Sequence, residues 1–175
     1  MLTNRSLILS TEHLRLQPMT DDHRDDFIDL FTNQEVAKTY MVPDFKTREE
    51  FVRLFENIKG MSSSSQRFVY GICLEDRLIG LLNDVGIADG VIELGYLIHP
   101  SQKGKGYATE ALGAAIKELF RLGFPAVKTG AFAENNASMR VMEKCGMTRT
   151  GELEQIPYRG KEHTCIYYQI KNPSI

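Results

Sequence analysis

The amino-acid sequence predicts a mixed α/β fold in which one mixed β-sheet carries helices on its faces. Residues 91–99 alternate apolar and polar side chains, as half-buried strands do. Residues 107–122 then place apolar side chains on one stripe of a helix, and residues 126–133 have the composition of a further strand. Because strands and helices alternate in this way along the chain, we expect the helices to cover a mixed sheet.

Length and composition are those of an ordinary globular domain. The chain has 175 residues, of which 42% are hydrophobic and 25% charged. A chain of this length buries roughly 70% of the surface that it exposes when unfolded, so one domain spanning residues 1–175 is predicted. Lys and Arg number 21 against 23 Asp and Glu, a net charge of -2 that does not favour nucleic-acid binding. No segment has the roughly 18 consecutive apolar residues of a membrane span, so no membrane partner is predicted.

The cysteines and histidines indicate neither disulfides nor a metal site. Cys73, Cys145 and Cys165 are an odd number without a Cys-x-x-Cys spacing, which is typical of buried thiols in a reducing compartment. The N-terminus shows no secretory signal, and we therefore expect a cytoplasmic protein. Four histidines lack metal-binding spacing, so no metal is predicted: His13, His23, His99 and His163.

The N-terminal half predicts a strand, two helices and a hairpin. Residues 13–19 alternate like a strand, and Thr20 then offers a cap for a helix that carries Phe27, Leu30 and Phe31. Thr47 to Glu50 form a capping box that begins a second helix, which runs to Met61. Four serines at 62–65 predict a loop, and residues 67–74 and 77–87 predict a hairpin that turns at Glu75-Asp76.

The C-terminal half predicts a strand at 91–99, a long helix at 107–122, a strand at 126–133, a short helix at 135–145 and a final hairpin. Gly123 and Gly146 supply the left-handed residues that end the two helices. On the long helix, polar residues including Glu118 are expected to face outward. The hairpin, with its turn at 158–160, leaves an exposed strand that could pair in a homodimer or remain an edge.

The segment Lys-Gly-Lys-Gly-Tyr-Ala at 103–108 is a candidate anion site between a strand and a helix. Its glycines let the backbone approach a ligand closely, and the first turn of the helix offers free N–H groups to a phosphate or pyrophosphate. The alternative is a tight turn with solvated lysines. The spacing matches neither the Walker loop nor the dinucleotide fingerprint.

Glu93 is a candidate general base. On the strand at 91–99 it shares one face with Gly95 and Leu97, and the glycine leaves room there for a ligand. Partial burial would raise the carboxyl pKa toward values useful for proton abstraction. The alternative is a solvated glutamate on a half-exposed strand. Likewise, Asn135 and Ser138 have a plain interpretation as helix-capping residues.

Taken in order, these segments resemble the GCN5-related N-acetyltransferase (GNAT) superfamily, and within it the branch similar to ribosomal-protein alanine acetyltransferases. The matching motifs are Glu-Leu-Gly-Tyr at 93–96, Pro100, the stretch 104–112 and the pattern Asn-x-Ala-Ser-x-Arg-Val-x-Glu-Lys-x-Gly at 135–146. The resemblance implies a twisted sheet in which the two central parallel strands, at 91–99 and 126–133, splay apart.

The resemblance further implies that acetyl-CoA is the cosubstrate and lies in the splay. Its pyrophosphate would lie on the glycine loop, at Lys103, Gly104, Lys105, Gly106, Tyr107 and Ala108. Its pantetheine arm would pair with the strand backbone at Leu97, Ile98 and His99, helped by Asn135. Lys103 stands where relatives usually have Arg or Gln, which keeps the charge but loses the planar fork.

The implied reaction is direct transfer of an acetyl group to a primary amine, either a protein N-terminus or a small amine. Glu93 matches the strand carboxylate that serves as base in several members. The tyrosine that acts as acid in many members is replaced by Met142, and Ser138 matches the serine proposed for this branch. The missing tyrosine leaves open a non-catalytic acyl-CoA-binding or sensor module, and the glycine loop leaves open a nucleotide-phosphate-binding protein.

Overall fold

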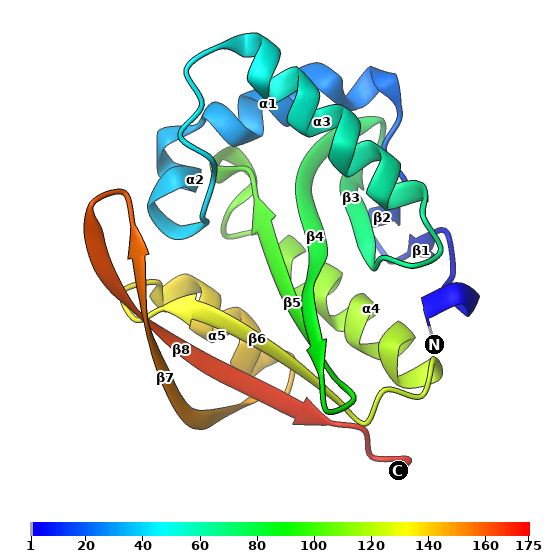
Figure 1. Ribbon diagram of the computed structural model, residues 1–175. Helices are drawn as coiled ribbons and strands as arrows, with labels where there is room; N and C mark the ends of the chain where they lie inside the picture. Colours follow the sequence, from blue (N-terminus) through cyan, green and yellow to red (C-terminus); the bar gives the residue numbers. More distant parts are fainter. Residues whose placement is uncertain (1) are drawn as a thin grey trace.

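The computed structural model describes residues 2–175 and shows one eight-stranded mixed sheet with the strand order β1-β2-β3-β4-β5-β6-β8-β7 (Figure 1). The strands are β1 (Leu9–Ser10), β2 (Leu14–Gln17), β3 (Val69–Leu74), β4 (Arg77–Ala88), β5 (Val91–Ile98), β6 (Ala126–Phe132), β7 (Thr148–Tyr158) and β8 (Lys161–Lys171). The helices are α1 (Arg24–Thr32), α2 (Gln34–Thr39), α3 (Arg48–Ser63), α4 (Tyr107–Arg121) and α5 (Asn136–Lys144). Short 3-10 turns lie at Leu2–Asn4, Asp21–His23 and Pro100–Gln102.

The predicted class of fold is confirmed, with helices on both faces of the sheet. Figure 1 shows α1, α2 and α3 on one face and α4 and α5 on the other. Each face has its own buried cluster: Leu112 and Leu119 of α4 pack with Ile92 of β5, while Phe27 of α1 and Phe55 of α3 form the opposite cluster. None of the helices in residues 2–175 is both long and apolar enough to cross a membrane.

The central parallel strands separate as the sequence resemblance implies. β5 and β6 pair from Val91 with Ala126 to Leu94 with Thr129, and the pairing ends there. Beyond that point β5 continues to pair only with β4, as far as Ile98 with Gly80. The β6 side of residues 95–98 is therefore left without a strand partner. This opening positions the candidate site.

The start of α3 is predicted correctly, and its end is not. Thr47 and Glu50 form the capping box, since the Glu50 carboxylate accepts from the Thr47 N–H at 2.9 Å. The helix, however, continues through Ser62 and Ser63, which were predicted as a loop. Ser62 is fully buried because its hydroxyl donates to the Lys59 carbonyl at 2.7 Å and accepts from the Met19 N–H at 2.9 Å. The contact with Met19, which follows β2, and the contact with Lys59 within α3 stabilise a helical turn that serine by itself does not favour.

The helix α2 was not predicted. Its six residues are too few for a clear apolar period, although the Asn33 side chain caps it by accepting from the Glu35 N–H at 2.9 Å. Figure 1 places α2 near the tip of the β7–β8 hairpin. There, the Tyr158 hydroxyl donates to the Ala37 carbonyl at 2.8 Å, which joins two segments that are far apart in the sequence.

The final hairpin is present, and its second strand is the inner one. β8 pairs with β6 along the whole of β6, from Ala126 with Lys171 to Phe132 with Cys165. β7 pairs with β8 and forms the edge of the sheet, so the predicted exposed strand is β7. The turn at Arg159 and Gly160 has left-handed backbone at both residues, as two-residue hairpin turns require.

The predicted apolar stripe of α4 is buried, and one residue expected to be exposed is buried with it. Glu118 retains only 6% of its exposure. Its carboxylate accepts from the Ser6 N–H at 2.6 Å and from Arg121 at 2.7 Å, and this guanidinium holds the pKa of Glu118 below its usual value. The prediction was wrong because Ser6 lies far away in the sequence. Only the folded chain supplies that donor.

Replacing Glu118 by alanine is expected to lower the free energy of unfolding by about 2 kcal/mol, because it removes a charge-assisted hydrogen bond and leaves the Ser6 N–H without its acceptor. Urea unfolding measures this change. Lys117→Ala, on the exposed side of the same turn, is the matched control and is expected to change stability by less than about 0.5 kcal/mol. Equal stability of the two variants would show that the carboxylate adds nothing to the fold.

The three cysteines are unpaired thiols, as predicted. Cys73 and Cys165 are buried and Cys145 is half-buried. Burial raises the pKa of Cys73 to about 11 and that of Cys145 to about 11, so both are protonated near neutral pH.

Candidate active site

A cavity of about 310 Å³ opens where β5 and β6 separate, and we call it the larger cavity. Its walls come from the end of β5, the loop before α4, the first turn of α4, the helix α5 and the helix α2. Of the three residues expected to meet the pantetheine arm of a cosubstrate, Leu97 and Ile98 at the end of β5 line it. The third, His99, is turned toward α1, where its Nε2 lies 2.9 Å from the Asp29 carboxylate.

The glycine loop forms the cavity wall at the N-terminus of α4. Gly104 and Gly106 have φ values of 76° and 82°, a left-handed conformation that side-chain-bearing residues rarely adopt. No heavy atom lies within 4 Å of the position that a Cβ would take at either glycine, so the backbone there faces open space. Gly106 is the N-cap residue of α4, and Tyr107 and Ala108 of its first turn also line the cavity. The arrangement suits an anionic group.

Three cationic side chains line the larger cavity: Lys103, Arg140 and Lys144. Only Lys103 was predicted to face a ligand. Arg140 and Lys144 stand four residues apart on α5 and therefore lie on one face of that helix. Their spacing was visible in the sequence, but their proximity to Lys103 depends on how α5 packs beside α4. Lys105, which was predicted as a ligand, does not line the cavity and donates to the Gln102 side chain at 2.9 Å.

A second cavity of about 200 Å³, the smaller cavity, meets the larger one. Five residues line both cavities and mark their junction: Thr39, Tyr40, Tyr96, Asn135 and Ser138. Glu93 lines the smaller cavity and not the larger one. The structure thus brings Glu93, Asn135 and Ser138 together around one space, while Tyr40 and Tyr96 were not anticipated as site residues.

Hydrogen bonds with Asn135 and Tyr96 hold Ser138 at the junction. The Asn135 side chain accepts from the Ser138 N–H at 3.2 Å, which is the predicted capping contact of α5. The Ser138 hydroxyl lies 2.7 Å from the Tyr96 hydroxyl, and burial raises the pKa of Tyr96 above its usual value. The Tyr96 hydroxyl also lies 3.3 Å from the Ser138 backbone carbonyl, so its one hydrogen has two acceptors on Ser138. When that hydrogen is donated to the Ser138 hydroxyl, the serine hydrogen is free to point into the cavity.

Glu93 is partly buried, with 28% of its side chain exposed. Burial raises the pKa of its carboxyl, and the Lys128 ammonium at 4.0 Å acts in the opposite direction. Lys128 is itself held by the Glu152 carboxylate at 2.7 Å and lies 4.0 Å from the centre of the Tyr167 ring. A carboxylate with a raised pKa beside a cavity has the properties of a general base.

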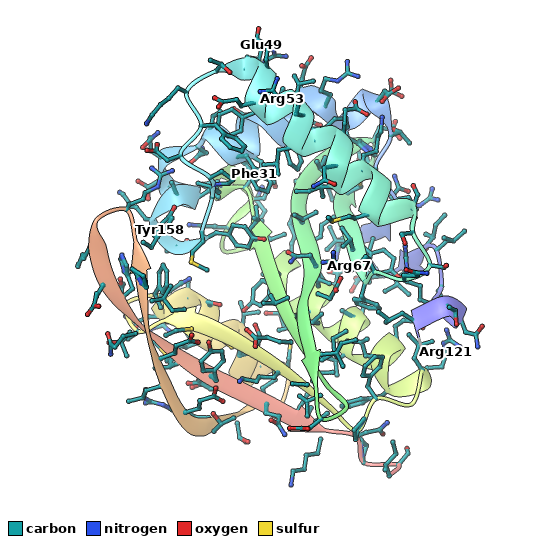
Figure 2. The ribbon with its side chains drawn as sticks, viewed as in Figure 1. Phe31, Glu49, Arg53, Arg67, Arg121 and Tyr158 are labelled. Carbon is teal, nitrogen blue, oxygen red and sulfur yellow. The ribbon has the colours of Figure 1, made fainter. Side chains whose placement is uncertain are left out.

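Thr39 of α2 and Ile156 of β7 both line the smaller cavity, and a hydrogen bond joins these two elements. Tyr158, whose hydroxyl donates to the Ala37 carbonyl, lies between the β7–β8 hairpin and α2 in Figure 2. The Tyr40 hydroxyl donates to the Asn83 side chain at 2.9 Å and so fixes the ring at the junction.

Known proteins share both the sequence pattern and the fold. Residues 13–148 match the acetyltransferase (GNAT) domain family. An uncharacterised N-acetyltransferase of Bacillus subtilis, YoaA, is 27% identical over 172 residues, which cover 95% of this chain and 97% of YoaA. The similarity therefore extends over nearly the full length of both chains.

Two solved structures show the same fold at lower sequence identity. RimL, a ribosomal alpha-N-protein acetyltransferase solved in complex with coenzyme A, superposes with a TM-score of 0.80 at 19% identity, covering 94% of this chain and 97% of RimL. A ribosomal-protein alanine acetyltransferase from Vibrio fischeri superposes with a TM-score of 0.78 at 15% identity, covering 96% and 98%. The family match extends over most of the chain and includes the glycine loop. The protein is therefore an N-acetyltransferase of the GNAT family.

Proposed function

We propose that this protein binds acetyl-CoA in the larger cavity and transfers its acetyl group directly to a primary amine held in the smaller cavity. The observation that carries the proposal is the junction at Tyr96 and Ser138, where a cavity lined by cations meets a cavity that contains Glu93. Two substrates that enter from opposite sides would meet at this point.

The larger cavity has the chemistry that acetyl-CoA requires. Lys103, Arg140 and Lys144 supply positive charge for its phosphates, and the N-terminus of α4 supplies backbone donors. The unpaired side of β5 at Leu97 and Ile98 can accept an amide-bearing chain as an added strand. The complex of RimL with coenzyme A supports this assignment, because that protein shares the fold.

Bound acetyl-CoA would supply the acetyl group as a thioester. Glu93 would accept a proton from the amine, directly or through water, as the nitrogen forms its bond to the carbonyl carbon. Ser138 would donate a hydrogen bond to the departing sulfur as the carbon–sulfur bond breaks, held for this task by Asn135 and Tyr96. Met142 lies where, by the resemblance, many family members carry the tyrosine that acts as general acid. Met142 is fully buried, so we assign it no role in the transfer.

Calorimetric titration with acetyl-CoA, with ATP and NAD as controls, tests the assignment of the larger cavity. We expect acetyl-CoA to bind at micromolar concentrations and to bind more tightly than either control. An amine screen that measures release of the free CoA thiol then tests the transfer. A folded protein that does not bind acetyl-CoA at tens of micromolar would contradict the proposal, and binding without turnover of any amine would favour a non-catalytic acyl-CoA sensor.

Lys128 is expected to set the pH at which Glu93 becomes active. Because the Lys128 charge lowers the carboxyl pKa, Lys128→Met should raise that pKa and move the acid limb of the kcat/KM profile to higher pH. The plateau at high pH should remain, since Glu93 itself is intact. Profiles measured with the best acceptor from the screen check this shift. Lys171→Met, at the exposed end of β8, is the control, and an acid limb that moves equally in both variants would refute the role of Lys128.

A further inference from the structure

The walls of the smaller cavity are largely apolar. Met41, Val85, Phe132 and Ile156 line it together with the rings of Tyr40 and Tyr167. Its volume of about 200 Å³ exceeds the roughly 150 Å³ of an apolar cavity that admits benzene. An aromatic ring or a short branched hydrocarbon therefore fits in the space beside Glu93.

The two cavities differ sharply in charge. Lys103, Arg140 and Lys144 line the larger cavity, whereas no lysine or arginine within residues 2–175 lines the smaller one. Glu93 supplies the formal charge of the smaller cavity. The other titratable groups in its wall, the tyrosine hydroxyls and the Cys165 thiol, have pKa values raised by burial and are neutral near pH 7.

Among residues 2–175, the cation paired most closely with Glu93 is Lys128, and a second carboxylate shares it. The Lys128 ammonium lies outside the cavity wall and is paired with Glu152 at 2.7 Å. A further carboxylate, that of Glu154, accepts a hydrogen bond from the Tyr167 hydroxyl. The surroundings of Glu93 thus carry more negative than positive charge, so they attract a cation and oppose an anion.

We infer that the acceptor is a cationic amine with an apolar substituent, aromatic or branched, and without a carboxylate next to the amine. The inference rests on the proposed function, because it takes the smaller cavity as the acceptor site. An ammonium group would pair with Glu93 while its substituent packs against the apolar wall. A free amino acid would place its own carboxylate near Glu93, with no lysine or arginine of residues 2–175 in the cavity wall to pair with it, and that arrangement is strongly unfavourable.

The probes 2-phenylethylamine and L-phenylalanine test this inference, because they share the ring and the primary amine and differ in the carboxylate. Calorimetry in the presence of saturating CoA measures their binding, and release of the CoA thiol from acetyl-CoA measures transfer. We expect 2-phenylethylamine to exceed L-phenylalanine by about 100-fold in affinity and in kcat/KM. We also expect it to exceed ethylamine by at least about tenfold, because ethylamine lacks the ring.

Met41 allows the charge selectivity to be changed on purpose. Its side chain lines the smaller cavity and is 52% exposed, so a charged residue there is compatible with folding. Met41→Arg is expected to improve L-phenylalanine relative to 2-phenylethylamine by about tenfold, because it supplies the missing counter-ion. Met41→Gln, of similar length without the charge, is the control and should leave the ratio unchanged.

The outcomes separate the inference from the proposed function. Equal or better use of L-phenylalanine by the unaltered protein would overturn the inference while leaving acetyl transfer intact. A ratio that Met41→Arg does not change would also overturn it, since charge would then not set the selectivity. Failure of the protein to bind acetyl-CoA would instead refute the proposed function. Selective binding of 2-phenylethylamine in the absence of transfer would support the cavity assignment and refute catalysis.

Discussion

Glu93→Gln is expected to lower the rate of acetyl transfer by about 100-fold to 10,000-fold, the range typical of losing a general base. Glutamine keeps the size of the side chain and cannot accept the proton of the amine. Because Glu93 lines the smaller cavity and not the larger one, the affinity for acetyl-CoA should stay within about twofold. Steady-state kinetics measures the first effect and calorimetric titration the second.

Glu152→Gln is the matched control for this experiment. Glu152 lies near Glu93, through its pairing with Lys128, but it does not line either cavity. Its negative charge raises the pKa of Glu93, so its removal should shift the acid limb to lower pH and leave the plateau rate within about threefold. If Glu93→Gln retained the plateau rate as well, the proton would have another acceptor, and the assignment of Glu93 as base would fail.

Gly106→Trp is expected to weaken acetyl-CoA binding by more than about 100-fold. The glycine has a φ of 82° and faces open space within the larger cavity, so an indole ring would occupy the volume assigned to the phosphates. The substitution would also disturb the N-cap of α4, whose free N–H groups belong to the proposed anion site. Loss of the calorimetric signal with acetyl-CoA measures the effect.

Gly151→Trp controls for the strain of a bulky residue at positive φ. Gly151 has a φ of 83°, finds no heavy atom within 4 Å of a Cβ position and lies on the edge strand β7 outside both cavities. This variant should bind acetyl-CoA as the unaltered protein does. Circular dichroism and thermal unfolding establish that both variants are folded. Unchanged binding by a folded Gly106→Trp variant would exclude the glycine loop as the cosubstrate site.

Local sequence signals predicted the parts of the site that lie within one element. Alternation along residues 91–98 placed Glu93 and Leu97 on one face of β5, and that assignment needs only the period of a strand. The capping pattern at Asn135 likewise located the start of α5. The glycines before Tyr107 located the start of α4 for the same reason, since they act on the residues immediately beside them.

Contacts between distant segments were not predictable in the same way. The burial of Glu118 depends on Ser6, and the contact between the β7–β8 hairpin and α2 depends on Tyr158 and Ala37. The position of Ser138 depends on Tyr96, which belongs to another element. Each of these pairs is separated by more than forty residues. No local period carries information about such a pair.

The amino-acid sequence alone was thus sufficient for the family, the class of fold and the candidate residues Glu93, Gly106 and Ser138. Only the tertiary structure revealed that Arg140 and Lys144 join Lys103 around one cavity, and that Glu93 occupies a second cavity with no cationic wall among the described residues. The physical reason is the range of the interactions. Capping, turn geometry and periodicity act between residues within about four positions, whereas the charge and shape of a cavity arise from side chains that packing brings together.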